Sequence, residues 1–345
     1  MEIGIDSFVP VALAPAAQSA AASADRVRDL LEEVERAEAV GLDVFAVGEH
    51  HRPDFIASAP AVLLAAAAAR TARIRLASAV TVLSSDDPVR VFQQFATLDL
   101  ISRGRAEIIV GRGSFIESYP LFGFDLKDYD ALFTEKLALL LAIRDTTHVN
   151  WSGKHRAPLT GQGVYPRPVQ QRLPIWIGVG GTPQSFARAG ELGLPLVVAI
   201  IGGDLHRFRP LIDLYRDRGH RAGHTPERLT VGIHQIGFLA DTMEEAVETF
   251  YPAYADTFTR IGKERGWPPV TRAQFDATRG PRGALLVGDP ETVAVKMAAT
   301  NRILGGVDRM TVLLGAGAMR HSATMHAIEL LGTRVAPVVR AAAKQ

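Results

Sequence analysis

The chain contains no cysteine, and this absence excludes several kinds of chemistry. Disulfide bridges, thiolate nucleophiles, zinc–thiolate centres and iron–sulfur clusters all require that residue. A surplus of one charge is also lacking, because 38 Lys and Arg residues offset 37 Asp and Glu residues and leave a formal net charge of +1. Nucleic acids and anionic membrane surfaces attract strongly basic proteins, so we expect neither as a partner.

Long hydrophobic runs are absent as well. The longest, residues 59–69, has 11 residues, whereas a transmembrane helix needs about 20. Residues 1–8 lack the basic and apolar regions of a secretory signal peptide. With 47% hydrophobic and 22% charged residues the composition is that of a globular protein with a sizeable core, and we expect a cytoplasmic location.

Short β-rich runs alternate with helical patterns along the chain. Asp87-Pro88, Thr182-Pro183 and Asp289-Pro290 are each typical of a helix start, with a capping side chain before a proline at the first helical position. The predicted strands are residues 2–8, 43–47, 74–83, 105–110, 174–179, 195–201, 230–239 and 309–314. The predicted helices are residues 24–40, 58–71, 87–102, 128–144, 205–219, 243–265 and 289–303, with further helices beginning at 182 and 321.

Eight strands, each followed by a helix, predict a single (β/α)8 TIM barrel that spans residues 1–345 as one domain. A doubly wound sheet is the alternative, but it would need about two fewer strands and a domain break. Two long connections exceed a minimal barrel: residues 145–172 before strand five, and residues 266–288 between strands seven and eight. Connections of this length are usually functional loops or lids, with oligomer contacts as the alternative.

Active sites of such barrels lie at the carboxyl ends of the strands. Glu49-His50-His51 follows strand two directly. Neighbouring strand residues point to opposite faces, so one imidazole should face the barrel mouth and the other the surrounding shell. Histidine is the side chain best suited to proton transfer near neutral pH, although an exposed pair of loop residues without a function is the alternative.

A second group of residues predicts an anion site. Gly178-Val179-Gly180-Gly181 leads into a helix at Pro183, where glycines permit close approach and the helix start favours negative charge. Arg112, between two glycines at the end of strand four, can hold two phosphate oxygens in a planar fork. The third glycine of a dinucleotide fingerprint is missing. Simple turn chemistry, and a rim salt bridge for Arg112, are the alternatives.

The combined pattern resembles the bacterial luciferase-like, flavin-dependent monooxygenase family over nearly the whole chain. The strings that carry the resemblance are Glu49-His50-His51, the strand Ser78 to Leu83 followed by Asp87-Pro88-Val89-Arg90, Arg103-Gly104-Arg105, Val110-Gly111-Arg112-Gly113, Tyr165-Pro166-Arg167-Pro168-Val169-Gln170, Gly180-Gly181-Thr182-Pro183, and Val287-Gly288-Asp289-Pro290-Glu291-Thr292-Val293.

The resemblance implies a barrel that binds FMN or, in some branches, the deazaflavin F420. It implies a phosphate site at the end of strands four and five, and a third strand passing under the flavin ring with a cis peptide bond between Ala79 and Val80. The matching cofactor-binding positions are Ser78, Ala79, Val80, Arg112, Ser114, Val179, Gly180, Gly181, Thr182 and Ser185.

His50 matches the catalytic histidine of the family, and a neutral imidazole beside the ring could move the proton that oxygen chemistry requires. Glu49 could orient this imidazole or raise its pKa, with a structural partner to a backbone amide or an arginine as the alternative. His51 is expected behind the site. Gly111 stands where the luciferases carry a reactive cysteine, which argues against aldehyde-dependent light emission.

We therefore expect an FMN-dependent monooxygenase or oxidoreductase that uses reduced flavin and O2 on a small organic substrate. No Rossmann fingerprint for NAD(P)H is found, so a separate flavin reductase is expected, and the family's habit suggests a homodimer. The aromatic segment 115–128 and residues 266–288 are expected to shape the substrate pocket. Alternatives are an F420-dependent dehydrogenase, a non-catalytic flavin-binding homologue, and a metal-dependent hydrolase using His50, His51 and His234.

Overall fold

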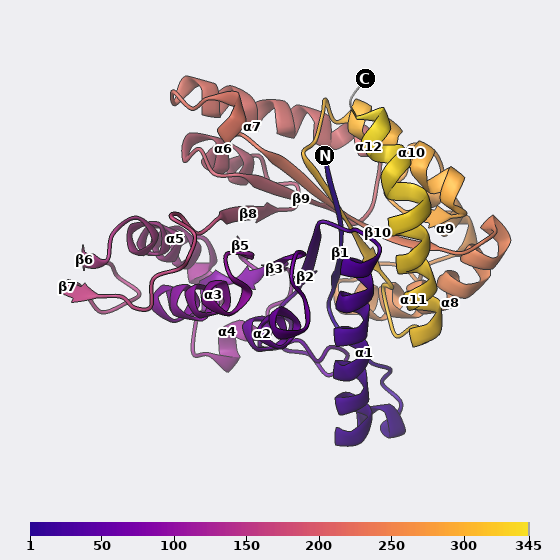
Figure 1. Ribbon diagram of the computed structural model, residues 1–345, viewed down its shortest axis with the longest axis horizontal. Coiled ribbons are helices and arrows are strands. Elements are labelled where there is room, and N and C mark those ends of the chain that lie inside the picture. Colours follow the sequence, from indigo (N-terminus) through magenta and orange to yellow (C-terminus); the bar gives the residue numbers. More distant parts are fainter. Residues whose placement is uncertain (344–345) are drawn as a thin grey trace.

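The computed structural model describes residues 1–343, so the last two residues of the predicted domain lie outside it. Eight parallel strands close into a barrel, and helices cover its outer face (Figure 1). The (β/α)8 prediction is confirmed. The barrel strands, in order around the barrel, are β1 (Glu2–Ser7), β2 (Val44–Val47), β3 (Arg75–Ser78), β5 (Ala106–Gly111), β8 (Ile175–Val179), β9 (Leu196–Ile200), β10 (Val231–Leu239) and β12 (Arg309–Leu314).

The helices follow the strands in the predicted order. They are α1 (Ala20–Ala39), α2 (Pro60–Arg70), α3 (Pro88–Ser102), α4 (Ser118–Leu121), α5 (Tyr129–Asp145), α6 (Pro183–Glu191), α7 (Arg209–Arg221), α8 (Met243–Glu264), α9 (Arg272–Arg279), α10 (Pro290–Ile303), α11 (His321–Leu330) and α12 (Ala336–Ala342). None of the helices within residues 1–343 combines the length and the apolar character that crossing a membrane demands.

Two of the three predicted helix caps are present. The Asp87 carboxylate accepts a hydrogen bond from the backbone N–H of Val89 at 2.8 Å, and Asp289 accepts one from Thr292 at 2.9 Å. The third helix also begins as predicted, at Pro183 with Thr182 in the N-cap position, but the Thr182 side chain accepts no hydrogen bond from the first turn of α6. This helix start therefore lacks a side-chain cap, and its amides keep their capacity to bind an anion.

Three segments differ from their predicted form. The third strand does not run unbroken over residues 74–83: β3 ends at Ser78, the Ala79–Val80 peptide is cis as the resemblance implied, and the short β4 (Thr81–Val82) pairs with β5. Residues 145–172 hold an antiparallel hairpin of β6 (His148–Trp151) and β7 (Leu159–Gly163). Residues 266–288 hold α9 and β11 (Leu286–Gly288), which extends the sheet beside β10.

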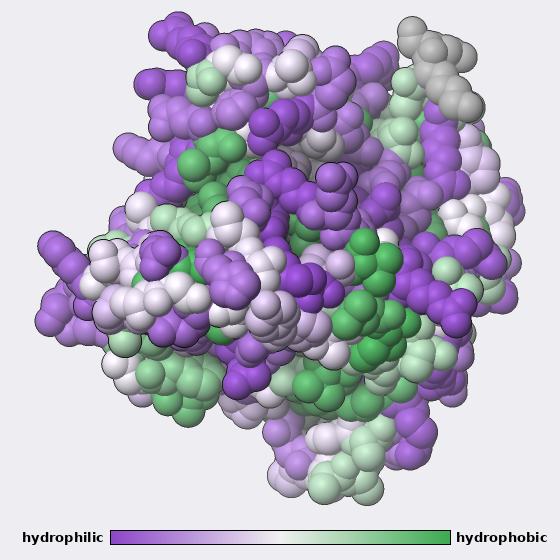
Figure 2. All heavy atoms as spheres, turned by 60° about the vertical axis from the view of Figure 1, so that its left-hand side comes forward, coloured by the Kyte–Doolittle hydropathy of each residue, from purple (hydrophilic) through white to green (hydrophobic). Residues whose placement is uncertain are grey.

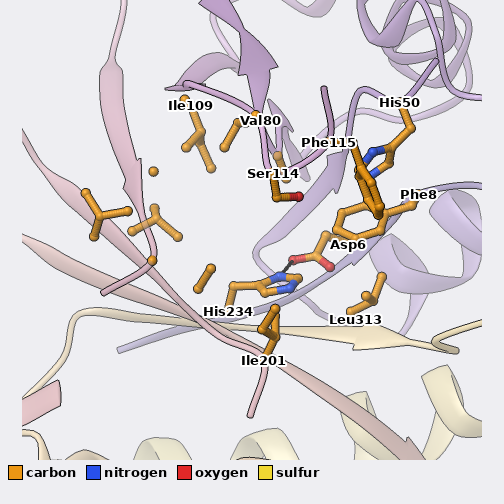
Figure 3. Close-up of a pocket in the computed structure, with 18 of the residues that line it drawn as sticks. Asp6, Phe8, His50, Val80, Ile109, Ser114, Phe115, Ile201, His234 and Leu313 are labelled. Atoms are coloured by element: carbon orange, nitrogen blue, oxygen red, sulfur yellow. Dashed lines mark hydrogen bonds and ion pairs between the residues drawn. The ribbon is translucent and has the colours of Figure 1, made fainter. Parts of the chain in front are cut away.

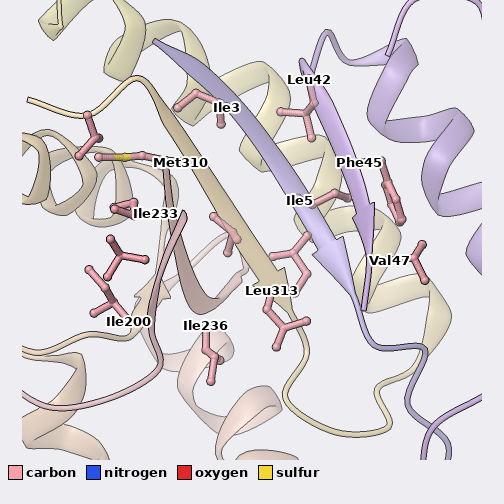
Figure 4. Close-up of a cluster of buried hydrophobic side chains, with 14 of the residues drawn as sticks. Ile3, Ile5, Leu42, Phe45, Val47, Ile200, Ile233, Ile236, Met310 and Leu313 are labelled. Atoms are coloured by element: carbon pink, nitrogen blue, oxygen red, sulfur yellow. The ribbon is translucent and has the colours of Figure 1, made fainter. Parts of the chain in front are cut away.

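Side chains alternate across the barrel wall. Ile3 and Ile5 of β1 pack outward against the helices, together with Phe45 and Val47 of β2 (Figure 4). Asp6, next in the alternation, therefore points inward. A small apolar cluster that includes Trp176 and Ile109 fills part of the interior.

The amino-terminal end of the barrel is closed by a buried ion pair. The Arg309 guanidinium lies 2.6 Å from the Glu107 carboxylate, and it stacks 4.4 Å above the Trp176 ring. This packing leaves the carboxyl end as the open end, where the polar side chains of the site converge.

Candidate active site

A cavity of about 570 Å³ opens at the carboxyl end of the barrel (Figure 3). This volume lies within the range of cofactor and substrate pockets, about 300–1,000 Å³. Residues that follow β2, β3, β5, β8 and β9 contribute to its wall. The outer surface in Figure 2 is mainly polar, with apolar patches gathered in its lower half.

Three phenylalanine rings surround the His50 imidazole at one side of this cavity. Its ring centroid lies 4.5 Å from that of Phe8, 4.6 Å from that of Phe55 and 5.1 Å from that of Phe115. The buried Nε2 atom has no hydrogen-bond partner among residues 1–343. Burial lowers the pKa of His50 to about 4, because the aromatic surroundings penalise the charged ring. The imidazole is therefore neutral at pH 7.

The Glu49 carboxylate makes no hydrogen bond to the His50 imidazole and binds two neighbouring groups instead. It accepts hydrogen bonds from the backbone N–H of Val82 at 2.9 Å and from Nε2 of His51 at 2.9 Å. The expectation that Glu49 orients His50 is therefore not met, and the alternative of a structural partner to a backbone amide is what the structure contains. His51 also packs edge-on against Phe122 at 5.1 Å.

Arg112 lines the same cavity. Its guanidinium forms an ion pair with Asp130, donates a hydrogen bond to Oγ of Ser185 at 3.2 Å, and stacks over the Tyr129 ring at 4.9 Å. The arginine is thus both a rim salt-bridge partner and a neighbour of the α6 start. One nitrogen of the guanidinium contacts a carboxylate, while another contacts the Ser185 hydroxyl.

Two further arginines lie near Arg112, and sequence reasoning missed both. Arg188 of α6 makes no ion pair within the described chain; burial and the charge of Arg112 lower its pKa below the usual value. Arg207 lines the cavity, with its guanidinium 3.7 Å from where a Cβ on Gly181 would lie. It also lacks a carboxylate partner in residues 1–343. The region therefore carries excess positive charge, which suits an anionic group.

The Val80 side chain of the cis peptide segment packs closely over two glycines. A Cβ added to Gly111 would lie 2.7 Å from Val80, and one added to Gly178 would lie 2.6 Å from it. Any larger residue at either position would displace the Val80 side chain. Gly111 thus has a local packing reason for lacking a side chain.

Most of the predicted site residues come together around this cavity. His50, Glu49, Ala79, Val80, Arg112, Ser114, Val179, Gly180, Gly181 and Thr182 line it. Ser78 does not, because its buried hydroxyl exchanges hydrogen bonds with the backbone of Ile109 at 3.1 and 3.0 Å. Ser185 is also buried behind the wall and reaches the site through Arg112.

Both segments expected to shape a substrate pocket reach the cavity. Phe115 lies between the guanidinium of Arg52 at 4.6 Å and that of Arg265 at 5.2 Å, and Trp267 lines the same wall. Within residues 1–343, no cluster of three or more His, Asp or Glu side chains is placed to hold a metal ion.

Sequence reasoning also overlooked a buried pair on the far wall. Asp6 at the end of β1 accepts a hydrogen bond from Nδ1 of His234 on β10 at 2.6 Å, and both residues line the cavity (Figure 3). The sequence did indicate that Asp6 faces inward, because side chains alternate along a strand and Ile3 and Ile5 face outward. His234 was considered only as a candidate metal ligand, and its position within a continuous strand gave no sign of its pairing with Asp6.

Comparison with known proteins identifies similar chains. An N-acetyl-S-alkylcysteine monooxygenase of Bacillus subtilis is 34% identical over 208 residues, which is 58% of this chain and 60% of that protein. An F420-dependent glucose-6-phosphate dehydrogenase of Amycolatopsis mediterranei is 32% identical over 179 residues, 48% of this chain and 51% of that protein. The chain thus aligns with little more than half the length of these curated relatives.

A solved structure shares the fold over the full length. The oxygenating constituent of 3,6-diketocamphane monooxygenase from Pseudomonas putida, in complex with FMN, superposes with a TM-score of 0.79 at 22% identity and covers 98% of each chain. The family model for luciferase-like monooxygenases matches residues 1–308. The chain therefore belongs to the luciferase-like monooxygenase family.

Proposed function

We propose that this protein is an FMN-dependent monooxygenase that uses reduced flavin and O2 on a small organic substrate. The observation that carries the proposal is the joining of an arginine-rich anion site and a desolvated, neutral His50 in one cavity. The relative from B. subtilis is named a monooxygenase, and the P. putida structure contains FMN.

The residues of the anion site fit the phosphate of a flavin mononucleotide. Arg112 supplies a planar pair of donors, Ser185 is a hydroxyl beside it, and the start of α6 has no side-chain cap. At Gly180 a Cβ would have no neighbour within 4 Å, so this turn has open space in front of it. Arg207 lies beside Gly181 of this turn and adds a second cation.

The ring of the cofactor would lie between this anion site and His50, against the Ala79–Val80 segment. Reduced FMN would supply the electrons that activate O2. His50 would hold or accept a proton at Nε2, since this atom is buried, neutral and unpartnered within residues 1–343. Its aromatic neighbours exclude water from the same region, which strengthens every polar interaction made there.

An F420-dependent dehydrogenase is the second candidate, because one relative carries that activity in its name. Titration of the purified protein with FMN and with F420, followed by fluorescence, separates the two. We expect tighter binding of FMN; tighter binding of F420 would reject the proposal in favour of this candidate.

Catalysis is tested with a flavin reductase, NADH and FMN, with oxygen consumption and H2O2 release as the readouts. His50→Gln should alter the partition between coupled and uncoupled oxygen use, whereas the matched control His51→Gln should behave as the wild type in FMN binding. FMN binding without any effect of the protein on reduced-flavin oxidation would instead indicate a non-catalytic flavin-binding protein.

The separate reductase and a homodimer are also proposals. Apolar side chains stand exposed on the early helices, with Val62 of α2 68% exposed and Leu100 and Ile101 of α3 44% and 46% exposed. Burying them between two copies would be favourable. Analytical ultracentrifugation of the wild type and of Val62→Glu tests this arrangement.

A further inference from the structure

The Asp6–His234 pair is a second titratable group in the cavity, and the chemistry proposed above does not use it. The side chains are 1% and 9% exposed, and Nδ1 lies 2.6 Å from Oδ2. The other carboxylate oxygen of Asp6 is buried without a partner among residues 1–343. Two strands that are not neighbours in the barrel, β1 and β10, thus meet through this contact across β12.

The surroundings of the two imidazoles in the cavity shift their pKa values in opposite directions. Burial would lower the pKa of His234, but the charge of Asp6 and its hydrogen bond outweigh burial and raise it above the ordinary value. His50 instead has its pKa lowered by burial. Phe8 lies between them, 4.5 Å from the His50 ring and 6.0 Å from the His234 ring. Where the surroundings raise the pKa of one group and lower that of another, the first is suited to act as an acid and the second as a base.

The surroundings of His234 leave its outer nitrogen without a protein partner. The only hydrogen bond of this imidazole to residues 1–343 is made by Nδ1. Ile201 and Leu313 lie beside the ring (Figure 3), and Thr311, its neighbour on β12, gives its hydroxyl hydrogen to the backbone of Ile233. The Nε2 atom of His234 thus has no partner within residues 1–343, at a part of the cavity wall that also holds apolar side chains.

A purely structural role explains this pair poorly. A buried ion pair stabilises a fold weakly compared with well-packed apolar residues, because both charges must leave water. The amino-terminal end of the barrel already has its own buried pair, Arg309–Glu107. A pair that lines the cavity is better accounted for by what it binds there.

We propose that His234, charged and oriented by Asp6, donates a hydrogen bond from Nε2 to an oxygen of the substrate. The substrate class is then an apolar molecule that bears a neutral carbonyl-type oxygen. The pair has no net charge, so a substrate carboxylate would bring a second anion to one imidazolium and leave a buried surplus of negative charge. A plain hydrocarbon would leave the donor unpaired, at the cost of its desolvation.

This inference rests on the proposed function for the identity of the site, but its test does not require turnover. The probes are acetophenone, its hydrocarbon analogue ethylbenzene and its anionic analogue benzoate. Dissociation constants are measured by ligand-observed NMR, on the protein as purified and after addition of FMN. The ¹³C carbonyl resonance of labelled acetophenone reports hydrogen bonding directly.

We expect the wild type to bind acetophenone about tenfold more tightly than ethylbenzene, as a charge-assisted hydrogen bond allows. Benzoate should bind no more tightly than ethylbenzene, and the carbonyl resonance should move downfield on binding. His234→Phe should abolish the preference for the ketone, and Asp6→Asn should reduce it. The control His220→Gln, at an exposed histidine in the last turn of α7, should keep it.

Equal affinity of the wild type for ketone and hydrocarbon would overturn the inference, and so would a preference that survives in His234→Phe. Tightest binding of benzoate would overturn the neutral-oxygen assignment. The wild-type comparison decides the matter even where a variant does not fold. FMN binding without a ketone preference defeats this inference alone, whereas a ketone preference without FMN binding defeats the proposed function alone.

Discussion

The charge state of His50 can be tested through the stability of the fold. Replacing His50 by Phe keeps an aromatic ring among those of Phe8, Phe55 and Phe115 but removes the titratable group. In the unfolded chain the imidazole has its ordinary pKa of 6.5, and in the folded chain about 4. As the pH falls from about 6.5 towards 4, the imidazole binds a proton in the unfolded chain but stays unprotonated in the folded chain. The wild type therefore loses stability over this window.

The size of the loss follows from the two pKa values. The full difference corresponds to roughly 3 kcal/mol at about 1.4 kcal/mol per pH unit, and at pH 5 about 2 kcal/mol of it has been lost. We expect the free energy of unfolding of the wild type to fall by about 2 kcal/mol more than that of His50→Phe between pH 7.5 and pH 5. Each protein is compared with itself at the two pH values, so the effect of the substitution on stability that does not depend on pH cancels.

Urea unfolding at the two pH values, followed by circular dichroism, measures this difference. The control is His220→Gln, which removes an exposed histidine at the end of α7 and should leave the pH dependence of the wild type unchanged. An equal loss of stability in the wild type and in His50→Phe would refute the claim that the imidazole is buried and neutral.

Three further predictions follow from the site. His50→Gln should lower turnover about 10²-fold or more while FMN affinity stays nearly unchanged, measured by steady-state oxygen consumption and FMN fluorescence; normal turnover would remove His50 from the chemistry. Arg112→Ala should raise the dissociation constant for FMN by roughly 10- to 100-fold, the equivalent of 1.5–3 kcal/mol, and leave riboflavin affinity unchanged; parallel losses for both ligands would argue against a phosphate contact. Gly178→Ala should lower the free energy of unfolding by about 1–3 kcal/mol, because its Cβ would lie 2.6 Å from Val80. Gly180→Ala, whose Cβ meets nothing within 4 Å, is the matched control, and equal stability of the two variants would contradict the packing argument.

The barrel was predictable because its signals are local. Alternating apolar strands and amphipathic helices repeat along the chain, and the caps at Asp87 and Asp289 formed as predicted. The hairpin in residues 145–172 and the three-residue β11 were missed, since strands so short carry little periodicity. Thr182 occupies the predicted N-cap position without the expected side-chain hydrogen bond, because the residue type alone does not fix the side-chain direction.

The site was predictable where residues adjoin a strand end, and less so elsewhere. His50 and Arg112 could be recognised as site residues because they follow the ends of β2 and β5. The partner of Glu49 could not be read from the sequence, because the choice between His50 and His51 depends on the path of the loop. Asp6 and His234 are 228 residues apart, and only closure of the barrel brings them together.

The central claim is that one cavity holds a flavin phosphate at Arg112 and the flavin ring near His50. A crystal structure of the protein with FMN tests it directly. The account predicts the phosphate within hydrogen-bonding distance of Arg112 and the turn at residues 180–182, with the ring between the Ala79–Val80 segment and the imidazole. A phosphate bound elsewhere, or a ring that does not approach His50, would contradict it.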